Sequence, residues 1–545
     1  MSGTRRPHVV MVVQNDVSGD TRVKKSALSL ASAGCNVTVY GFSKDGRPWE
    51  TMVGSVRILR LADPLRASRR RQGRRNRLVL SGPPLAYRTQ AALEHAVARR
   101  EVRRAHVVAA VAAWKSRIDA RQVRIERAGR RTLADRLAVA SLWYRIKGWR
   151  TLALLPDLVF RLRLKSTQGQ RLTTALLRKA RQLAGPRFGR AEWAPAPVDP
   201  LAHLLTLEEL LIEALRKRAE PVDALHAHDF FTIGMVDRAA RMLSPSGDPV
   251  PWIYDAHEYV SGLDFFTPER RAAALRLESR HIAAAARVIT VTPDLAARLH
   301  ADYPLSRRPA VVLNAPARLD SPPVNETVRT RLGLSSDVPL LVYAGQVKEP
   351  RDVHTLVAAL AFLPGVHLAI LTANVGAYVD GLGELAAEVG AADRYHRLPY
   401  VASHAVSSFL SDADVGVVPL THYGNAEVAL PTKLFEYLHA GLPMVVSDTL
   451  AMRNFVEELA IGEVFVAGEA RSLAAAALAV LAHREHYVKP MASDPDLLMR
   501  YSWQRQEGVL LDVYADVLGQ SLVSGEDAPT SLEEHRPGRE EATQR

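Results

Sequence analysis

Cysteine and long apolar runs are both scarce in this chain of 545 residues. The single cysteine, Cys35, excludes an internal disulfide and a metal site built from several cysteines. No stretch of about 18 uncharged apolar residues occurs, so the sequence predicts no membrane-spanning helix. The first apolar run, 9–13, ends at Gln14 and is too short for the apolar core of a signal peptide. We therefore expect a cytoplasmic protein.

Aromatic residues are also few, at 6% of the sequence, although hydrophobic residues together make up 48%. This composition is typical of a globular chain, and the length allows about two or three domains with full-sized cores. The sequence also lacks a GxSxG turn, a GKS or GKT phosphate loop and a CxxC pair. These absences argue against several common hydrolase, nucleotide-hydrolysing and redox sites.

Positive charge is concentrated in one segment. The whole chain has a net charge of +13, but residues 61–190 hold 32 Lys and Arg against 7 Asp and Glu. The rest of the chain is therefore net acidic. Within this segment, long helical patterns cover 87–128 and 133–182 and interrupt the strand and helix alternation of the flanking sequence. We predict a basic helical insert at about 65–190.

Three roles are open for the insert. Trp143 and Trp149 alternate with Lys147 and Arg150 ahead of an apolar stretch, which is typical of a helix lying on anionic lipid. A purely structural insert with solvated arginines fits the composition almost as well. The segment has enough positive charge to bind nucleic acid, but the absence of a recognised nucleic-acid module argues against that role.

Strand and helix patterns alternate on both sides of the insert. The first half has predicted strands at 8–13, 36–42, 55–61, 224–228, 252–255, 288–291 and 310–313, with helices at 22–33, 204–217, 231–242, 268–286 and 293–300. The second half has predicted strands at 340–345, 367–372, 415–420 and 444–446, with helices from 353, from 379 and from 431 to 441. Such alternation predicts two α/β domains with parallel sheets.

These patterns also set the expected domain boundaries. We expect an N-terminal domain over 1–318, which includes the insert, and a C-terminal domain over 327–500. A helix over 501–519 should pack back on the N-terminal domain. The polar, acidic tail over 520–545 is expected to be disordered.

The segment LPTKLFEYLHAGLP, residues 430–443, predicts a short helix between two apolar strands. Pro431 suits its first turn, and Gly441 suits a left-handed cap at its end. Lys433 and Glu436 are its charged residues. A cation near such a helix start suits a diphosphate, and a carboxylate one turn later suits sugar hydroxyls. On pattern alone, an ordinary amphipathic crossover helix explains these charges at least as well.

The same segment carries a family resemblance. LPTKLFEYLHAGLP resembles the donor-site helix of the retaining, nucleotide-sugar-dependent glycosyltransferases of family four. These enzymes have the GT-B fold, in which two Rossmann-like domains face a cleft. The resemblance extends over both α/β halves and implies a transferase that uses a nucleotide-sugar as co-substrate and needs no metal or other cofactor.

The resemblance implies a donor site in the C-terminal half, made up of Gly345, Arg351, Asn425, Leu430, Thr432, Lys433 and Glu436. Arg351 and Lys433 would grip the diphosphate of the donor. The arginine that often follows the family's glycine is Gln346 in this chain, and the family's first glutamate falls at Val428, with Glu427 one residue away. This departure leaves the identity of the donor sugar open.

The N-terminal half is expected to supply the catalytic and acceptor groups. In ALHAHD, residues 224–229, the period of two places His226 and His228 on one face of a strand. The resemblance implies that His228 lies close to the reacting sugar as the catalytic residue, although either histidine fits a plain core role. The implied acceptor or cleft residues are Gly19, Asp20, Arg22, Asp255, His257 and Glu258. A metal site from these histidines and carboxylates is conceivable, but the resemblance implies none.

The resemblance implies retaining transfer of a sugar from a nucleotide-sugar to an acceptor. Envelope glycans, lipid-linked sugars and small molecules are the acceptor classes considered, and a membrane acceptor would be reached from the cytoplasmic face. One alternative is another GT-B enzyme, such as a nucleotide-sugar epimerase. Another is a non-catalytic GT-B-like partner subunit whose basic insert binds other molecules.

Overall fold

The computed structural model describes residues 5–43, 47–62, 140–141, 201, 203–218, 220–244, 247–263, 267–318 and 326–523. The predicted basic insert lies outside the described residues except for two helical positions, 140 and 141. The expected disordered tail lies outside them from residue 524 onward. The predictions for both segments therefore stay predictions.

The chain divides into two compact units. One comprises Met1–Gly41, Glu50–Leu59 and Pro221–Arg545, and it contains nearly all of the strands. The other comprises Phe42–Trp49 and Arg60–Glu220. The helix that the structure describes in this unit is α5 (His203–Arg216), which buries leucines that recur with helical spacing.

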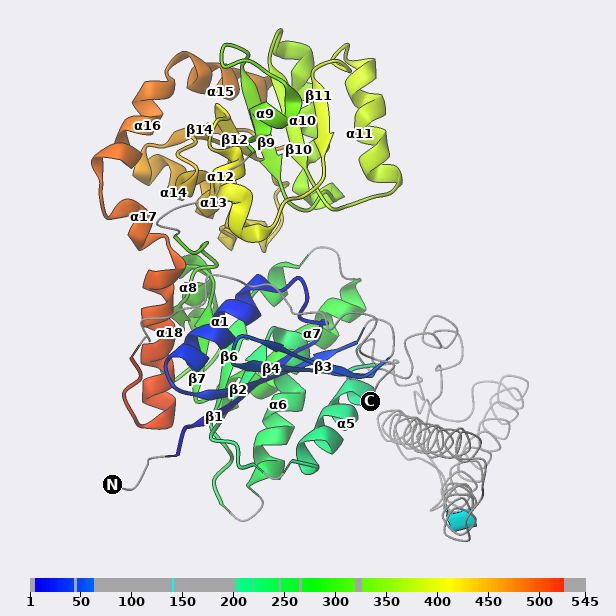
Figure 1. Ribbon diagram of the computed structural model, residues 1–545, viewed down its shortest axis with the longest axis vertical. Coiled ribbons are helices and arrows are strands. Elements are labelled where there is room, and N and C mark those ends of the chain that lie inside the picture. The colour runs from blue at the N-terminus through cyan, green and yellow to red at the C-terminus, as the bar shows by residue number, and fades with distance from the viewer. Residues whose placement is uncertain are drawn as a thin grey trace, which may run out of the picture. The chain divides into compact units, whose positions relative to one another are not determined.

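The first sheet has eight strands in the order β3-β4-β2-β1-β5-β6-β7-β8 (Figure 1). They are β1 (His8–Val13), β2 (Asn36–Phe42), β3 (Trp49–Val53), β4 (Val56–Leu61), β5 (Ala224–His228), β6 (Trp252–Ala256), β7 (Arg287–Thr290) and β8 (Ala310–Val311). The strand β1 pairs in parallel with β2 on one side and with β5 on the other. The order of strands thus reverses beside β1, which is where open α/β sheets bind ligands at their carboxyl edge.

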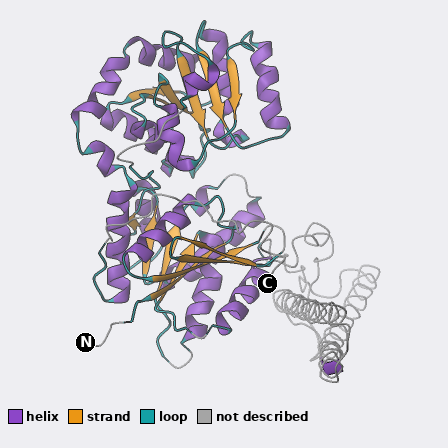
Figure 2. Ribbon diagram, viewed as in Figure 1, coloured by secondary structure: helices purple, strands orange, loops and turns teal. Residues whose placement is uncertain are grey.

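Helices cover this sheet on both faces (Figure 2). They are α1 (Thr21–Ser32), α6 (Phe230–Leu243), α7 (Pro268–His281), α8 (Pro293–Asp302) and α18 (Trp503–Leu518), with short 3-10 turns η1 (Val260–Gly262) and η2 (Ile282–Ala284). Alternate residues of β1, including Val9 and Met11, share one core with α1 and α18. The indole Nε1 of Trp503 in α18 donates to Ser29 Oγ in α1 at 3.0 Å.

The second sheet has six strands in the order β11-β10-β9-β12-β13-β14, and every pair is parallel. The strands are β9 (Leu340–Ala344), β10 (His367–Leu371), β11 (Tyr395–Leu398), β12 (Val415–Val418), β13 (Met444–Ser447) and β14 (Gly462–Phe465). The order of strands reverses beside β9, which lies between β10 and β12. The carboxyl edge at β9 and β12 is therefore the expected ligand-binding edge of this domain.

The helices of this domain are α9 (Val328–Leu332), α10 (Val353–Ala359), α11 (Ala377–Glu388), α12 (Val406–Leu410), α13 (Thr432–His439), α14 (Leu450–Leu459), α15 (Ala470–Ala482), α16 (Arg484–Ser493) and α17 (Leu497–Arg500). Four 3-10 turns accompany them, η3 (Glu349–Arg351), η4 (Leu360–Phe362), η5 (Ser403–Ala405) and η6 (Ala426–Val428). Along β9, Leu340 and Val342 pack with α12, α13 and α14, whereas Leu341 and Tyr343 pack with α10, α11 and α15. The strand is thus buried on both faces, which explains its unbroken apolar sequence.

The mixed α/β architecture with parallel sheets confirms the predicted fold class, and most predicted elements begin and end within about two residues of those observed. Three differences stand out. The strands β3, β11 and β14 were not expected, nor were the individual helices α9, α12, α14, α15, α16 and α17. The helix α7 ends at His281, because Ala286 N must donate to Trp252 O at 2.8 Å where β7 begins beside β6. Pro431 caps α13 in an extended conformation (ψ 142°) and is not part of its first turn.

Among the helices of the described ranges, none is both long and apolar enough to cross a membrane.

Candidate functional site

Asp255, near the carboxyl end of β6, is fully buried and serves as a shared acceptor. Arg22 binds both of its oxygens, with Nε 2.7 Å from Oδ2 and Nη2 2.8 Å from Oδ1. Burial alone would raise the pKa of Asp255, but Arg22 and the neighbouring His257 outweigh it and hold the pKa well below its usual value. The carboxylate is therefore ionised, and Arg22 is engaged inside the fold.

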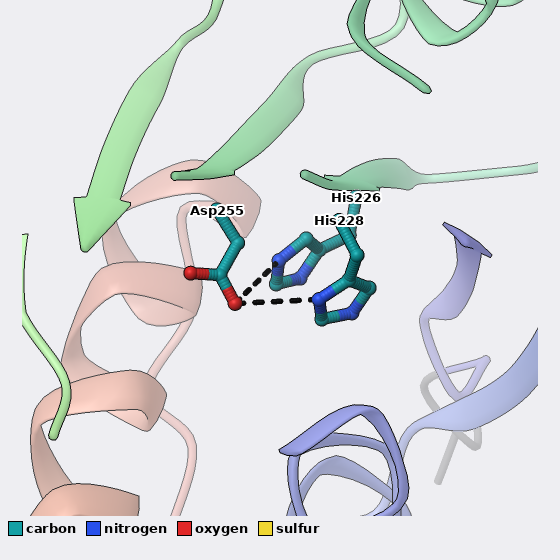
Figure 3. A group of neighbouring side chains, drawn as sticks. All are labelled: His226, His228 and Asp255. Carbon is teal, nitrogen blue, oxygen red and sulfur yellow. Dashed lines mark ion pairs between the residues drawn. The ribbon is translucent and has the colours of Figure 1, made fainter. Parts of the chain in front are cut away.

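Two histidines of β5 lie beside this carboxylate (Figure 3). His226 and His228 are stacked, with ring centroids 4.0 Å apart and planes 14° from parallel. His228 Nδ1 is 3.3 Å from Asp255 Oδ2, and His226 Nε2 is 3.8 Å from the same oxygen. His228 Nε2 is buried and has no hydrogen-bond partner among the residues the structure describes. If Nδ1 donates to Asp255, this Nε2 carries a free lone pair.

His257 adds a third imidazole to the cluster. Its Nε2 lies 3.2 Å from Asp255 Oδ2 and 3.4 Å from His228 Nδ1. Burial lowers the pKa of His257, but the neighbouring Asp255 carboxylate more than offsets it, so the pKa is raised overall. The anionic Asp255 is thus shared between the guanidinium of Arg22 and an imidazole that favours its charged form.

The ligand atoms of His226, His228 and Asp255 all lie within 4.8 Å of one another, so a metal ion was a formal possibility. Histidine and carboxylate are ordinary zinc ligands. However, both oxygens of Asp255 already accept hydrogen bonds from Arg22, whose charge would repel a cation. The arrangement fits a hydrogen-bonded ion-pair network better than a metal centre.

The loop after β1 lies at the same edge of the first sheet. A side chain at Gly19 would meet no atom within 4 Å, so the backbone here borders open space. Asp20 caps α1, because its side chain accepts from Val23 N at 3.1 Å and from Asn15 Nδ2 at 2.7 Å. Burial alone would raise the pKa of Asp20, but its neighbours, above all His257, hold the pKa below its usual value.

Two further carboxyl groups lie near His257. Burial, opposed in part by the charge of His257, raises the pKa of Glu258. Burial, followed by the charge of Glu258, raises the pKa of Asp229 to about 7. Asp229 also has a φ of 67°, a strained value for a residue with a side chain. Such strain is typical of residues at functional sites.

The expected donor residues lie at the carboxyl edge of the second sheet. Gly345 directly follows β9 with a φ of 123°, and a Cβ there would lie 3.7 Å from Lys433 Nζ. Lys433, in the first turn of α13, is buried, and its Nζ lies 3.4 Å from the ring centroid of Tyr343. Burial, and then the charge of Arg351, hold the pKa of Lys433 well below its usual value. Within the described part of the chain, neither cation has a carboxylate ion-pair partner.

Glu436 lies one turn after Lys433 on α13. Burial raises the pKa of Glu436 to about 7, although the charges of Lys433 and Lys25 oppose this rise. Thr432 Oγ1 accepts a hydrogen bond from Asn314 Nδ2 at 3.1 Å. Leu430 packs, partly buried, at the margin of the domain core.

The loop before α13 departs from the family pattern in a way that the structure explains. Val428 is buried, and its carbonyl accepts from Thr292 Oγ1 at 2.7 Å. Glu427 accepts from His422 Nδ1 at 2.6 Å and from Leu450 N at 2.9 Å. The carboxylate of Glu427 thus fastens the loop to the start of α14. Asn425, expected at the donor sugar, accepts from Tyr259 N at 2.7 Å through Oδ1.

Several of these relationships had no signal in the sequence. Arg22 and Asp255 are 233 residues apart, and His226 meets the hydroxyl of Tyr514 across 288 residues. His422, which lies between Glu427 and Asp448, follows an apolar strand as any loop histidine would. Only the alternation in ALHAHD predicted that two histidines would share a face.

Comparison with known proteins agrees with both halves of the fold. Residues 324–492 match the family model for glycosyl transferases group 1, and residues 166–315 match the model for a glycosyl transferase 4-like domain. A curated relative, D-inositol 3-phosphate glycosyltransferase from Geodermatophilus obscurus, is 28% identical over 282 residues. That match covers 48% of this chain and only 60% of the relative's own length.

Solved structures share the fold over nearly the whole chain. Sucrose-phosphate synthase from Thermosynechococcus elongatus has a TM-score of 0.58 at 14% identity, covering 94% of this chain and 100% of that one. A trehalose-6-phosphate protein from E. coli, bound with UDP-2-fluoro glucose, has a TM-score of 0.52 at 12% identity and covers 95% and 100%. These neighbours share the GT-B fold, and the two family models, which match residues 166–315 and 324–492, show that the chain belongs to the GT4-like glycosyltransferases.

Proposed function

We propose that this chain transfers a sugar, with retention, from a nucleoside diphosphate sugar to a hydroxyl of an acceptor. The observation that carries the proposal is the pair of cations Lys433 and Arg351 at the carboxyl edge of β9. Lys433 is buried, and the nearby charge of Arg351 further disfavours its charged form. A diphosphate bound there would supply the missing negative charge.

The neighbouring groups suit the rest of a nucleotide-sugar. Gly345 leaves the backbone open beside Lys433 Nζ, so a phosphate can approach both. Glu436 is placed one helical turn from Lys433, where an ionised carboxylate would accept hydrogen bonds from ribose hydroxyls. Because one neighbour of the same fold was solved with UDP-2-fluoro glucose, UDP sugars are the first donors to test.

The proposed reaction needs no general base from the protein. The bond between the anomeric carbon and the diphosphate breaks, and the acceptor oxygen bonds to that carbon from the same face. The leaving phosphate oxygen takes the acceptor's proton. Arg351 and Lys433 stabilise the charge that develops on the diphosphate. The free Nε2 of His228 accepts a hydrogen bond from a sugar hydroxyl, and we propose that no metal takes part.

The acceptor class is the finer part of this proposal. Because the matched relatives are named D-inositol 3-phosphate glycosyltransferases, a small phosphorylated polyol is the first candidate. Envelope glycans and lipid-linked sugars are the other two classes. For a lipid-linked acceptor, we propose that the basic segment 61–190 contacts anionic lipid. Co-sedimentation with anionic vesicles at low salt tests this contact.

The test is a donor and acceptor panel assayed for nucleotide release and glycoside formation, with the anomeric configuration of the product read by NMR. Lys433→Ala should lower turnover at least about 100-fold. Lys489→Ala, at an exposed position of α16, should leave turnover unchanged. An inverted product would exclude retention. Wild-type turnover in Lys433→Ala would exclude the proposed donor site.

The same panel separates the two alternatives. A nucleotide-sugar epimerase would change the sugar while it stays linked to the nucleotide, and no acceptor would be needed. A non-catalytic partner subunit would bind a donor without turnover. The combination of buried Lys433, Arg351 and a polar cluster around His228 favours the transferase.

A further inference from the structure

Tyr514 of the C-terminal helix α18 contacts the buried histidine pair of the first sheet. Its hydroxyl lies 2.7 Å from His226 Nδ1, and both side chains are fully buried. The rings are 5.9 Å apart and tilted by 44°, so the contact is a hydrogen bond and not a stack. In Figure 3, α18 is the pale red helix behind Asp255. The sequence assigned this helix only a packing role.

The direction of this hydrogen bond follows from the neighbouring charge. Burial, and then the nearby His228, lower the pKa of His226 to about 3, so the ring is neutral and has one N–H. Its Nε2 makes no hydrogen bond to the residues the structure describes, but it lies 3.8 Å from Oδ2 of the ionised Asp255. A lone pair facing a carboxylate is repelled, whereas an N–H is attracted. The proton therefore lies on Nε2, and the Tyr514 hydroxyl donates to Nδ1.

Tyr514 can hold this role throughout the ordinary pH range. Burial, with smaller contributions from Cys35 and Asp255, raises the pKa of its hydroxyl well above the usual value. The hydroxyl keeps its proton and stays a donor. Its helix is fixed by the core that it shares with β1 and α1.

The fixed orientation of His226 also affects Asp255 and His228. His226 is stacked directly on His228, and Asp255 Oδ2 lies near both rings. Without its Nδ1 partner, His226 is free to flip or change tautomer, which would present a lone pair to Asp255. That change would weaken the contact between Asp255 and His228 Nδ1, and it would release the His228 Nε2 lone pair from its fixed position.

We propose that Tyr514 and His226 are positioning residues for His228. The Tyr514 hydroxyl fixes the tautomer of His226, so that an N–H and not a lone pair is turned toward Asp255, while Arg22 holds both oxygens of Asp255 where the carboxylate accepts from His228 Nδ1. His228 Nε2 is thereby kept as an acceptor for a sugar hydroxyl. This inference rests on the proposed transferase function, and it makes α18 part of the reactive centre.

Tyr514→Phe tests the role, because it removes only the hydroxyl. We expect kcat for transfer to fall about tenfold, the loss expected for one buried hydrogen bond, with the KM of the donor unchanged. Tyr303→Phe is the matched control, since its hydroxyl donates to Glu278 Oε2 at 2.6 Å in the same domain. Tyr303→Phe should lower the free energy of unfolding about as much as Tyr514→Phe does, and it should leave kcat unchanged. Wild-type kcat in Tyr514→Phe would overturn the proposal.

A second readout separates failure of this inference from failure of the proposed function. Nitrogen-15 NMR of labelled histidines reports which ring nitrogen carries the proton, whether or not a substrate is known. We expect His226 to show an unprotonated Nδ1 in the wild type, and both His226 and His228 to change in Tyr514→Phe. Unchanged tautomers would overturn the inference even if transfer is established. Changed tautomers in a chain without transfer activity would support it and count only against the function.

A double variant tests whether the two residues act as one unit. In His226→Gln, the side-chain amide oxygen can accept from Tyr514 while its nitrogen donates toward Asp255, so this variant should retain most of kcat. Adding Tyr514→Phe to it should then cost as much as Tyr514→Phe alone costs the wild type. In His226→Leu, which offers the hydroxyl no acceptor, adding Tyr514→Phe should cost no further kcat, and a further tenfold loss there would show that Tyr514 does not act through His226 and would overturn the proposal.

Discussion

Arg22 and Asp255 form a bidentate ion pair that is buried at the carboxyl edge of the first sheet. The third nitrogen of the guanidinium, Nη1, donates to Val312 O at 2.7 Å. One side chain therefore joins α1, β6 and the segment that follows β8. Asp255 is the acceptor around which the three histidines are arranged, so this pair sets the geometry of the whole N-terminal cluster.

Arg22→Met is expected to lower the free energy of unfolding by about 3–5 kcal/mol, because it leaves a buried carboxylate unpaired. Urea unfolding measures this loss. The matched control is Arg57→Met, which breaks an exposed pair with Glu50 and should cost at most about 1 kcal/mol. Adding Asp255→Asn to Arg22→Met should restore part of the loss. Equal effects of the two single variants would mean that the buried pair adds nothing to stability.

Local sequence periods predicted most strands of the two sheets and the shared face of His226 and His228, because both depend only on residues close in the chain. The strands β3, β11 and β14 were missed, since WETMV, YHRL and GEVF are short, include a charged residue and show little alternation. Pro431 was placed one position too far into the helix, because proline is suited to both an N-cap and a first turn.

The contacts that organise the site could not be predicted in this way. Arg22 was expected among the acceptor or cleft residues and not as the ion-pair partner of Asp255, and Tyr514 was given no role within the terminal helix. Which distant side chain each would meet depends on the sheet order and on how α18 packs against α1. The family resemblance named His228 together with Arg22 and Asp255, but it did not indicate that Arg22 pairs with Asp255 or that Tyr514 contacts His226.

Lys433→Met is expected to raise the free energy of unfolding by about 1 kcal/mol or more, because a buried cation without a carboxylate partner is costly. The same substitution should abolish transfer, since the diphosphate loses a cation. Such an opposition between stability and activity is typical of functional sites. Thermal or urea unfolding measures the first effect, and nucleotide release the second. Lys489→Met should change neither, and a loss of stability in Lys433→Met would show that the lysine is a structural residue.

Glu436 makes stability depend on pH. Burial raises its folded-state pKa to about 7 from an ordinary value of 4.5. Between these values the folded state holds a proton that the unfolded state has released, so stability falls as the pH rises from 4.5 to about 7. Glu436→Gln should remove this part of the fall. The free energy of unfolding of the variant, relative to that of the wild type, should therefore increase as the pH rises to about 7. Parallel stability curves for the two proteins between these pH values would contradict the prediction.

Donor binding should show the opposite pH dependence, because ribose hydroxyls donate to the ionised carboxylate of Glu436. Donor affinity is expected to rise as the pH increases through about 7, the folded-state pKa of Glu436. Titration calorimetry with UDP at several pH values measures this rise. Glu436→Gln should bind more weakly and without that pH dependence. A variant that keeps the wild-type pH profile would show that another group titrates.

His422 fastens the loop that precedes the donor helix, with Nδ1 2.6 Å from Glu427 Oε1 and Nε2 2.9 Å from Asp448 Oδ1. The hydrogen bond to Glu427 is the main reason that the pKa of His422 is raised. Because the ring is half-exposed, its contribution to stability is small. His422→Ala should instead loosen the loop and raise the KM of the donor about threefold to tenfold, the equivalent of one weakened hydrogen bond. The control is His404→Ala, at an exposed 3-10 turn, which should leave the KM of the donor unchanged. An unchanged KM in His422→Ala would mean that the loop is held by its backbone contacts alone.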